Sequence, residues 1–514
     1  MLKKSSYFIL FSAVLAITAC SNYGESDAPF KNVPFFSDFE NQNDSEQNLS
    51  EFIENTQQWW IHYNDDQAEA YIYELLSQNL QLKAASARLL QAKEQTNIAR
   101  GALLPNLSSD GSFSRNSIPP NSNNNGFSSG QRFYNTSYDL GLSASWQLDF
   151  FGQLRNQLAS AQASFLASEA AKDALTHSLI VELLNARIAT ASLYKQKELI
   201  ERTIRSREKT LEIINRRYEL GVSGNSALEV RLARENLSAA KAQLPSILSA
   251  IQENTYRLDV LRGQMPNTED GDERYEDLSL PLPPERLILP PPLALLDTRP
   301  DLRNAELVLI AAKRDVKVAM ADLYPSIGIS GNYGFQAAEL GDLISSDSIA
   351  WSLLSNITQP LFEGGRIRSN IRLSKARAEE LSADYAQNVL TAIEDVENAL
   401  QREENFRNQY DALQDTLLES EKAYALARTR YEKGLIGLTD LLDIERRVLS
   451  LEQQLIDTQL SVWQSRFALH LALGGSWLDE MSTPQDEIKE KDISEQKAFQ
   501  DVRNNETIEV TISE

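Results

Sequence analysis

The chain has 514 residues, of which 50 are basic and 73 are acidic, and its formal net charge is −23. A negative balance of this size disfavours a nucleic acid as partner, because nucleic acids are themselves polyanions. The sequence shows no cysteine–histidine cluster, glycine-rich phosphate loop or nucleophile elbow, and its three histidines are scattered. Composition and motifs therefore predict neither an enzyme nor a metal site.

The first residues have the composition of an export signal. Lys3 and Lys4 precede an apolar run from Tyr7 to Ala16, which is too short to span a membrane, and Ile17-Thr18-Ala19-Cys20 follows. We therefore predict that residues 1–19 are a signal peptide.

Cys20 is the only cysteine of the chain, and the residues before it are similar to a lipoprotein signal-peptidase site. A lone thiol in an exported protein has no disulfide partner, whereas an acylated cysteine gains about 0.8 kcal/mol for each CH₂ buried in a bilayer. We predict a covalent lipid on Cys20, no other cofactor, and a lipid-anchored N-terminal extension over residues 20–60. A simple signal peptide with an incidental cysteine is the alternative. Ser21 follows, which resembles the bacterial sorting pattern for the outer membrane.

Short segments with alternating character stand before a long helical run. The clearest alternates small or polar residues with Leu140, Leu142, Ala144, Trp146, Leu148 and Phe150. This period is that of a β-strand with unlike faces, and strands of about ten residues with aromatic residues near their ends are typical of membrane barrels. A strand half-buried on a soluble core would carry the same pattern.

Two segments contain neither glycine nor proline, Gln153 to Leu220 and Arg366 to Lys433, and each has 68 residues. As single α-helices rising 1.5 Å per residue, they would be roughly 100 Å long. Helices of globular domains average about 11 to 12 residues, so the sequence predicts two long rods rather than a compact domain.

The two halves of the chain repeat the same order of features. Each rod follows an aromatic-glycine corner, Phe150-Phe151-Gly152 or Phe362-Glu363-Gly364-Gly365. Each ends alike, at Tyr218-Glu219-Leu220-Gly221 or Tyr431-Glu432-Lys433-Gly434, and equivalent positions lie 212 to 213 residues apart. This self-similarity indicates an internal duplication.

The duplication divides the chain. We predict a first structural repeat over residues 61–262, made of a helix, a strand pair, the rod and a return helix, and a second repeat over residues 301–475. Between them lies a connector over residues 263–300, which carries eight of the seventeen prolines and cannot be helical throughout. Residues 476–514 form an acidic C-terminal tail.

Each repeat supplies two strand-like segments, so four β-strands are expected per chain. A barrel that hides its backbone from lipid needs at least about eight strands, so other copies must complete it, and three copies would supply twelve. The predicted fold is mainly α-helical with a membrane β-barrel part. An internally duplicated protomer carries a long α-helical tunnel and four β-strands, and its trimer forms a twelve-stranded barrel.

Each rod is expected to turn at a glycine and to return as a shorter helix, over Ser226 to Arg262 and over Leu438 to Leu473, with a kink at Pro245 in the first. Ala68 to Leu104 and Asp301 to Leu323 are expected to be the helices that lead into strands. Val389, Ile393, Val396 and Leu400 follow the 4-3-4 spacing of an apolar coiled-coil seam. An ordinary antiparallel helical bundle would show the same spacing.

Several short motifs together resemble one family. They are Arg299-Pro300-Asp301-Leu302, a proline at Pro105 and Pro325 before a strand of each repeat, the corner at Phe362 to Gly365, and the Tyr-x-x-Gly turn followed by Leu-x-Asp. Over most of the chain the combination is similar to the TolC-like outer-membrane factors, in the lipoprotein branch that serves resistance-nodulation-division (RND) efflux systems. The resemblance implies a homotrimer with a twelve-stranded barrel in the outer membrane and a tunnel across the periplasm. A periplasmic adaptor protein and an inner-membrane RND transporter would feed its closed tip.

The resemblance also assigns residues at the second turn. Tyr431, Gly434, Asp440 and Asp443 fall on family positions, and the two aspartates are those that ring the constriction. Asp440 and Asp443 share one helix face, and crowded carboxylates from three copies would favour bound cations or narrow closure. We predict a periplasmic gate at Asp440 and Asp443, with Tyr431 and Thr439 beside it. The alternative is that Thr439 is an N-cap and that the acids only stabilise the helix dipole.

The turn also departs from the family pattern. Ile436 stands where some relatives have an arginine that helps to latch the tip, and the first turn offers Glu229 but no acid at the matching position. We therefore expect the network that closes the tip to be hydrophobic as well as ionic.

These features predict a passive exit duct for small molecules, lipid-anchored in the outer membrane, in contact with its lipid and spanning into the periplasm. Energy and most of the choice of substrate would come from the partner pump. Two alternatives stay open: a periplasmic lipoprotein spacer without a lumen, and an outlet for secreted polypeptides.

Overall fold

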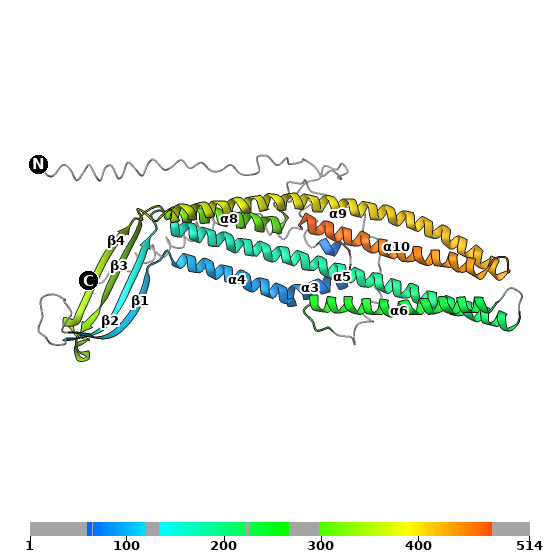
Figure 1. Cartoon of the computed structure of the whole chain (residues 1–514), viewed down its shortest axis with the longest axis horizontal. Helices are drawn as coiled ribbons and strands as arrows, with labels where there is room; N and C mark the ends of the chain where they lie inside the picture. The colour runs from blue at the N-terminus through cyan, green and yellow to red at the C-terminus, as the bar shows by residue number, and fades with distance from the viewer. Residues whose placement is uncertain are drawn as a thin grey trace, which may run out of the picture.

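Two helices of equal length run along the molecule (Figure 1). They are α5 (Gln153–Glu219) and α9 (Arg366–Glu432), with 67 residues each, so each is about 100 Å long. The prediction of two uninterrupted rods is confirmed, and each ends one residue earlier than the sequence indicated.

The computed structural model describes residues 59–63, 65–119, 133–221, 226–266, 283 and 298–474. The predicted signal peptide, Cys20, most of the N-terminal extension, most of the proline-rich connector and the acidic tail lie outside these residues. The structure therefore tests the predictions made for the two repeats.

Glycines with positive φ mark both ends of both rods. Gly152 (φ 78°) and Gly365 (φ 88°) are the N-caps, and Gly221 (φ 64°) and Gly434 (φ 72°) follow the C-termini. In the left-handed region an L-residue costs about 1–2 kcal/mol more than glycine, which explains why glycine stands at these corners. The same corners in both halves show the duplication in the backbone.

Four shorter helices of 22 to 36 residues pack along the rods. α4 (Leu80–Gly101) and α8 (Pro300–Ala321) lie in the half next to the sheet, and α6 (Ala227–Leu261) and α10 (Leu438–Leu473) lie in the other half (Figure 1). The rod α5 packs against all four, and α9 packs against α8 and α10. The return helices agree with their predicted ranges to within one residue at each end.

The helical wall before the first strand is broken, where the sequence predicted one helix from Ala68 to Leu104. α3 (Asp66–Gln78) ends before Asn79, whose ψ of 128° is extended. The Asn79 side chain accepts hydrogen bonds from two amides of the first turn of α4, at 2.8 and 3.1 Å, and donates to the carbonyl of Leu261 at 2.8 Å. The prediction of a continuous helix was wrong because Asn79 caps α4 and at the same time satisfies the end of α6.

The level at which α6 and α10 end and α4 and α8 begin is called the waist below. Two glycines make the same close approach there. A Cβ on Gly263 (φ 76°) or Gly474 (φ 86°) would lie 2.6 Å from the carbonyl oxygen of Gln78 or Thr298, respectively. Each repeat thus joins its two short helices end to end by backbone contact.

An apolar core also lies at the waist. It joins the 3-10 helix η3 (Trp59–Tyr63) to α3, α5, α6 and α10 through Trp60, Tyr71, Leu75, Leu183, Leu258, Trp463 and Phe467, among others. The last residues of the predicted lipid-anchored extension, Trp59 and Trp60, are therefore part of the core of the helical bundle.

One antiparallel sheet stands at one end of the rods. β1 (Asn106–Ile118), β2 (Phe133–Leu148), β3 (Ser326–Ala337) and β4 (Ile349–Thr358) follow in this order, and the 3-10 helices η5 (Leu340–Asp342) and η6 (Ser346–Ser348) connect β3 to β4. The prediction of four strands per chain is confirmed. Among the described residues β1 and β4 each have one neighbouring strand, so each leaves a row of backbone groups unpaired.

The two faces of the sheet differ as the alternation predicted. One face holds a polar ladder, in which the hydroxyls of Ser108 and Ser143 are 2.8 Å apart and Ser112 donates to Asp139 at 3.1 Å. The other face is apolar, and its exposed side chains include Leu107, Phe113, Leu140, Leu142, Trp146, Tyr333, Trp351, Leu353 and Ile357.

Among the described residues, no helix combines the length and the apolar character that crossing a membrane requires.

Candidate functional site

The end of the bundle opposite the sheet is called the tip below, and its second turn joins α9 to α10. The amide of Gly434 donates to the carbonyl of Tyr431, and that of Leu435 to the carbonyl of Arg430, both at 2.9 Å. These bonds satisfy the last carbonyls of α9 in the usual manner of a glycine-terminated helix. Gly437 is the N-cap of α10, so Asp440 falls in the first turn of that helix.

Asp440 and Asp443 are exposed on α10. The Asp440 carboxylate accepts a hydrogen bond from the amide of Gly437 at 3.3 Å, and Asp443 accepts one from the Arg446 guanidinium at 3.0 Å. Thr439 is also exposed, but it is not the N-cap, because Gly437 holds that position. The alternative that made Thr439 a cap was wrong, whereas Asp440 does stabilise the helix end.

Tyr431 is buried and links the two hairpins. The Arg217 guanidinium lies over its ring, 5.6 Å from the centroid. Burial, and then the negative charge of Glu229, raises the pKa of the Tyr431 phenol. Since Arg217 and Glu229 belong to the first hairpin, Tyr431 contacts that hairpin rather than standing in the open turn.

An apolar cluster fills the space between the hairpins at the tip. Its buried members come from all four helices: Ile214, Val230, Ala233, Ala427, Tyr431, Leu438, Leu441 and Leu442. Ile436, which replaces an expected latch residue, packs against this cluster. Within this chain the two hairpins are therefore held together by hydrophobic contacts, and the expectation about the network that closes the tip stays a prediction.

A polar junction lies next to this cluster, roughly 10–18 Å from the helix ends at 1.5 Å per residue. Arg207 of α5 donates to the backbone carbonyl of Asn236 on α6 at 2.7 Å, and its Nε lies 3.8 Å from Oε1 of Glu445 on α10. The Arg207 and Glu445 side chains are only 13% and 11% exposed. Burial raises the pKa of Glu445, and the charge of Arg207 offsets this only in part. Burial and the charge of Glu445 likewise raise the pKa of Tyr424 on α9.

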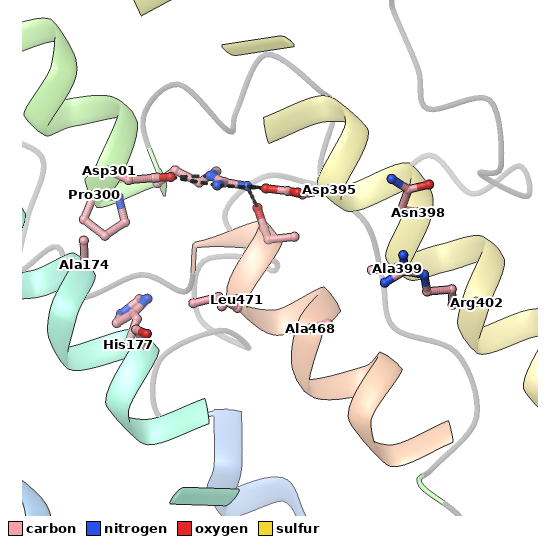
Figure 2. Close-up of a pocket in the computed structure, with 13 residues that line it drawn as sticks. Ala174, His177, Pro300, Asp301, Asp395, Asn398, Ala399, Arg402, Ala468 and Leu471 are labelled. Atoms are coloured by element: carbon pink, nitrogen blue, oxygen red, sulfur yellow. Dashed lines mark hydrogen bonds and ion pairs between the residues drawn. The ribbon is translucent and has the colours of Figure 1, made fainter. Parts of the chain in front are cut away.

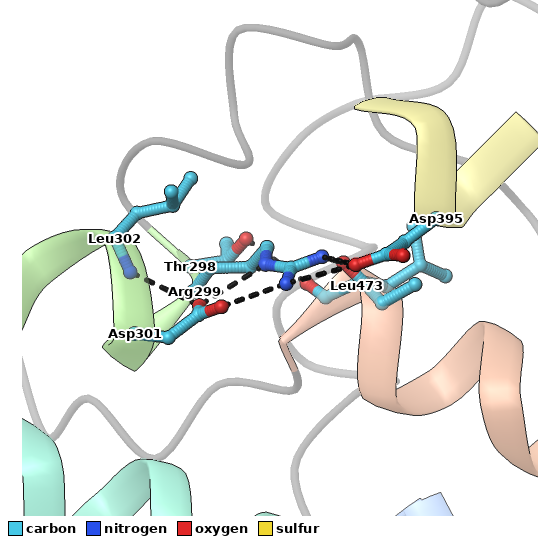
Figure 3. Close-up of polar contacts among 7 residues, drawn as sticks. Thr298, Arg299, Asp301, Leu302, Asp395 and Leu473 are labelled. Atoms are coloured by element: carbon cyan, nitrogen blue, oxygen red, sulfur yellow. Dashed lines mark hydrogen bonds and ion pairs between the residues drawn. The ribbon is translucent and has the colours of Figure 1, made fainter. Parts of the chain in front are cut away.

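The waist holds its charges differently. Arg299 donates to both oxygens of Asp301, with the shorter bond at 2.7 Å, to Asp395 of α9 at 3.3 Å and to the carbonyl of Ala472 at 3.0 Å (Figure 3). Burial works against the charge of Asp301, but Arg299 outweighs it, so the pKa of Asp301 is lowered. The guanidinium joins α8, α9 and the end of α10.

A cavity of about 400 Å³ lies beside Arg299 (Figure 2). His177 of α5 and Asn398 and Arg402 of α9 line it together with small apolar side chains. Burial lowers the pKa of His177 to about 4, although the charge of Asp301 opposes this. The cavity belongs to the packing of the waist, where α5, α8, α9 and α10 meet.

A second clamp at the waist includes the N-terminal segment. Arg466 of α10 makes two hydrogen bonds to Glu403 of α9, one of them at 2.8 Å, and both side chains are buried. The hydroxyl of Tyr63 is hydrogen-bonded to Nε2 of His470 at 2.8 Å, and the Trp59 ring stacks on that imidazole with the ring centroids 4.0 Å apart. Trp59 at the end of the predicted lipid-anchored extension and Tyr63 just after it are therefore fixed to α10.

A model of one protein family covers most of the two repeats. It is described as outer membrane efflux protein, and it matches residues 71–264 and 292–475. The chain belongs to the outer membrane efflux protein family. The family resemblance inferred from the sequence motifs is confirmed, and the family is one of outer-membrane proteins rather than of enzymes.

Relatives in the family are similar over most of their length. The toluene efflux pump outer membrane protein TtgC of Pseudomonas putida is 29% identical over 431 residues, which cover 82% of this chain and 86% of that protein. The cation efflux system protein CusC of Escherichia coli O6:H1 is 26% identical over 474 residues, 91% of this chain and 98% of the relative. The solved structure of the outer-membrane channel OprN superposes with a TM-score of 0.78 at 28% identity, over 88% of this chain and 99% of OprN.

The predicted site residues differ in how exposed they are. Asp440, Asp443 and Thr439 lie together on the exposed start of α10, whereas Tyr431 is buried between the hairpins. Cys20 lies outside the described residues. Within the part of the chain that the structure describes, no group of three or more His, Cys, Asp or Glu side chains is placed to hold a metal ion.

The sequence analysis missed Arg207 and Glu445, although their positions carry a signal. Glu445 stands between Leu441 and Val448, at the place of an apolar seam residue of α10, and Arg207 stands likewise between Thr203 and Ile214 on α5. A charge at a seam position is expected to be buried, so it needs a partner on a facing helix.

Proposed function

We propose that three copies of this chain form the passive exit duct of a tripartite efflux system, with a twelve-stranded barrel in the outer membrane. The observation that carries this proposal is the four-stranded sheet, which exposes its apolar face and leaves β1 and β4 with one neighbour each in the described chain. Backbone groups in lipid must be paired, and pairing β4 of one copy with β1 of the next would close the ring without an edge.

The dimensions of the strands support this arrangement. They have 13, 16, 12 and 10 residues, and a membrane strand needs about 9–11 residues when tilted. The apolar face would meet lipid and the serine-rich ladder would line the lumen. The rods, about 100 Å long, would continue the lumen as a helical tunnel into the periplasm.

The remaining parts of the proposal concern the two ends of the duct. A lipid on Cys20 would anchor the extension to the outer membrane, and Asp440 and Asp443 of three copies would ring a periplasmic gate. A periplasmic adaptor protein and an inner-membrane RND transporter would deliver the cargo. The names of the relatives refer to toluene and to cations, and for this chain we propose small toxic compounds, including drugs.

Conductance in planar bilayers tests the proposal. Protein purified in detergent should be a heat-labile trimer that forms channels, and D440A/D443A should raise the conductance because repelling and cation-binding groups leave the constriction. An elongated protein without conductance would support the lumen-free spacer, and a deletion strain that fails to secrete a polypeptide would support the polypeptide outlet. Unchanged conductance and ion sensitivity in D440A/D443A would remove the gate assignment alone.

A further inference from the structure

Glu445 is a buried carboxylate at the place where all four helices of the tip meet. Arg207 faces it from α5, Tyr424 of α9 lies near enough to be affected by its charge, and the Asn236 carbonyl of α6 accepts a hydrogen bond from Arg207. Arg207 thus makes a full hydrogen bond of 2.7 Å within the first hairpin, whereas it reaches Glu445 of the second hairpin only by an ion contact of 3.8 Å. The two hairpins share this charge pair but are weakly tied by it.

The long contact with Arg207 offsets little of the desolvation free energy that burial of the Glu445 carboxylate costs. At 3.8 Å the pair is beyond hydrogen-bond distance, and a carboxylate removed from water loses hydration that one distant cation does not replace. Separation of the hairpins would return Glu445 to water. The packed tip therefore favours the neutral carboxylic acid, and the separated tip favours the carboxylate.

The chain contains a matched pair in which this argument does not apply. Arg202 and Glu452 also join α5 to α10, at 2.5 Å, but the Arg202 side chain is 56% exposed. Solvent screens the exposed guanidinium, and the Glu452 carboxylate, 19% exposed, is compensated by a direct hydrogen bond from it, so the contribution of the pair is small. Glu452 is the natural control for Glu445.

We propose that Glu445 is a proton-linked positioning residue of the tip, which holds a proton more tightly when the α5–α6 and α9–α10 hairpins pack together than when they separate. The raised pKa of Glu445 in the packed chain gives the sign. A carboxyl whose pKa is raised by packing favours the packed arrangement at pH values below its ordinary pKa. This advantage is lost as the pH rises through the raised value. Acid therefore holds the hairpins together and higher pH lets them part.

The proposal rests on the exit-duct function, because conductance reports the separation of the hairpins. Glu445→Gln removes the titration but keeps a side-chain oxygen in the place of Oε1, which faces Arg207 at 3.8 Å, and Arg207 keeps its bond to Asn236. We expect E445Q to conduct at neutral pH as the wild type does at acid pH. Its open fraction should be roughly fivefold or more below that of the wild type, as for a typical coupling between two sites. E452Q should follow the wild-type pH profile.

Two further measurements separate the possible failures. The heat stability of the E445Q trimer should match the wild type, so that a change in conductance does not report misfolding. The same comparison in the D440N/D443N background removes the two exposed carboxylates of the turn. Higher conductance of E445Q at neutral pH, or a wild-type pH profile in E445Q, would overturn the proposal. If neither the wild type nor D440A/D443A forms channels, the exit-duct function itself fails.

Discussion

The waist and the tip both bury arginine–carboxylate pairs, yet the two regions hold them differently. At the waist, Arg466 and Arg299 each make two hydrogen bonds to one carboxylate, and the pKa of Asp301 is lowered. At the tip, Arg207 approaches Glu445 only to 3.8 Å, and the pKa of Glu445 is raised. Arg299 favours the ionised form of Asp301, whose side chain is 51% exposed, whereas burial disfavours the ionised form of Glu445. The waist is therefore suited to be a fixed point about which the hairpins of the tip move.

Breaking the buried pair at the waist should give the largest effect. Glu403→Ala leaves the guanidinium of Arg466, which is only 2% exposed, without its carboxylate, and loss of one partner of a buried pair costs about 3–5 kcal/mol. The neighbouring Glu404 is exposed on the same helix, so E404A is the control. Thermal unfolding of the detergent-solubilised trimer should show a much lower midpoint for E403A only. Equal midpoints would remove the distinction between a rigid waist and a movable tip.

The waist should also respond to acid in the opposite sense to the tip. The pKa of His177 is lowered to about 4 by burial, so below its ordinary value of 6.5 the unfolded chain binds a proton that the folded chain does not. Stability should fall by up to about 3 kcal/mol as the pH drops from about 7 to 4, since one pKa unit corresponds to about 1.4 kcal/mol. H177Q should show a smaller loss over this range. A parallel loss in H177Q would assign the acid sensitivity to other groups.

Substitution of one glycine at the tip and one at the waist should have a smaller effect on stability. Alanine at Gly434 meets no atom within 4 Å, so G434A should cost only the strain of its positive φ, about 1–2 kcal/mol. Alanine at Gly474 would bear the same strain and also place its Cβ 2.6 Å from the carbonyl of Thr298. We expect G474A to lower the thermal midpoint of the trimer more than G434A. Equal shifts would show that the waist yields as easily as the tip.

The local features of this fold could be predicted, and its long-range polar contacts could not. The rods and return helices follow from glycine and proline, which act on their own segment, and the strands follow from alternation. The break at Asn79 was missed because its hydrogen bond to Leu261 joins residues 182 positions apart. The aspartates of the turn were found through a family motif. Arg207 and Glu445 were missed because they become a pair only when α5 and α10 are placed side by side.

The equal lengths of α5 and α9 restrict how such a chain can grow or shrink. One inserted residue rotates the rest of the helix by about 100° about its axis, so its apolar seam no longer faces the neighbouring helix. Seven residues make nearly two full turns and restore the facing sides, but only if the same addition is made in both rods and in the helices that return beside them. Descendants of this chain with a longer or shorter helical part should therefore differ in reach by steps of about 10 Å, with matched insertions in the two halves of the gene.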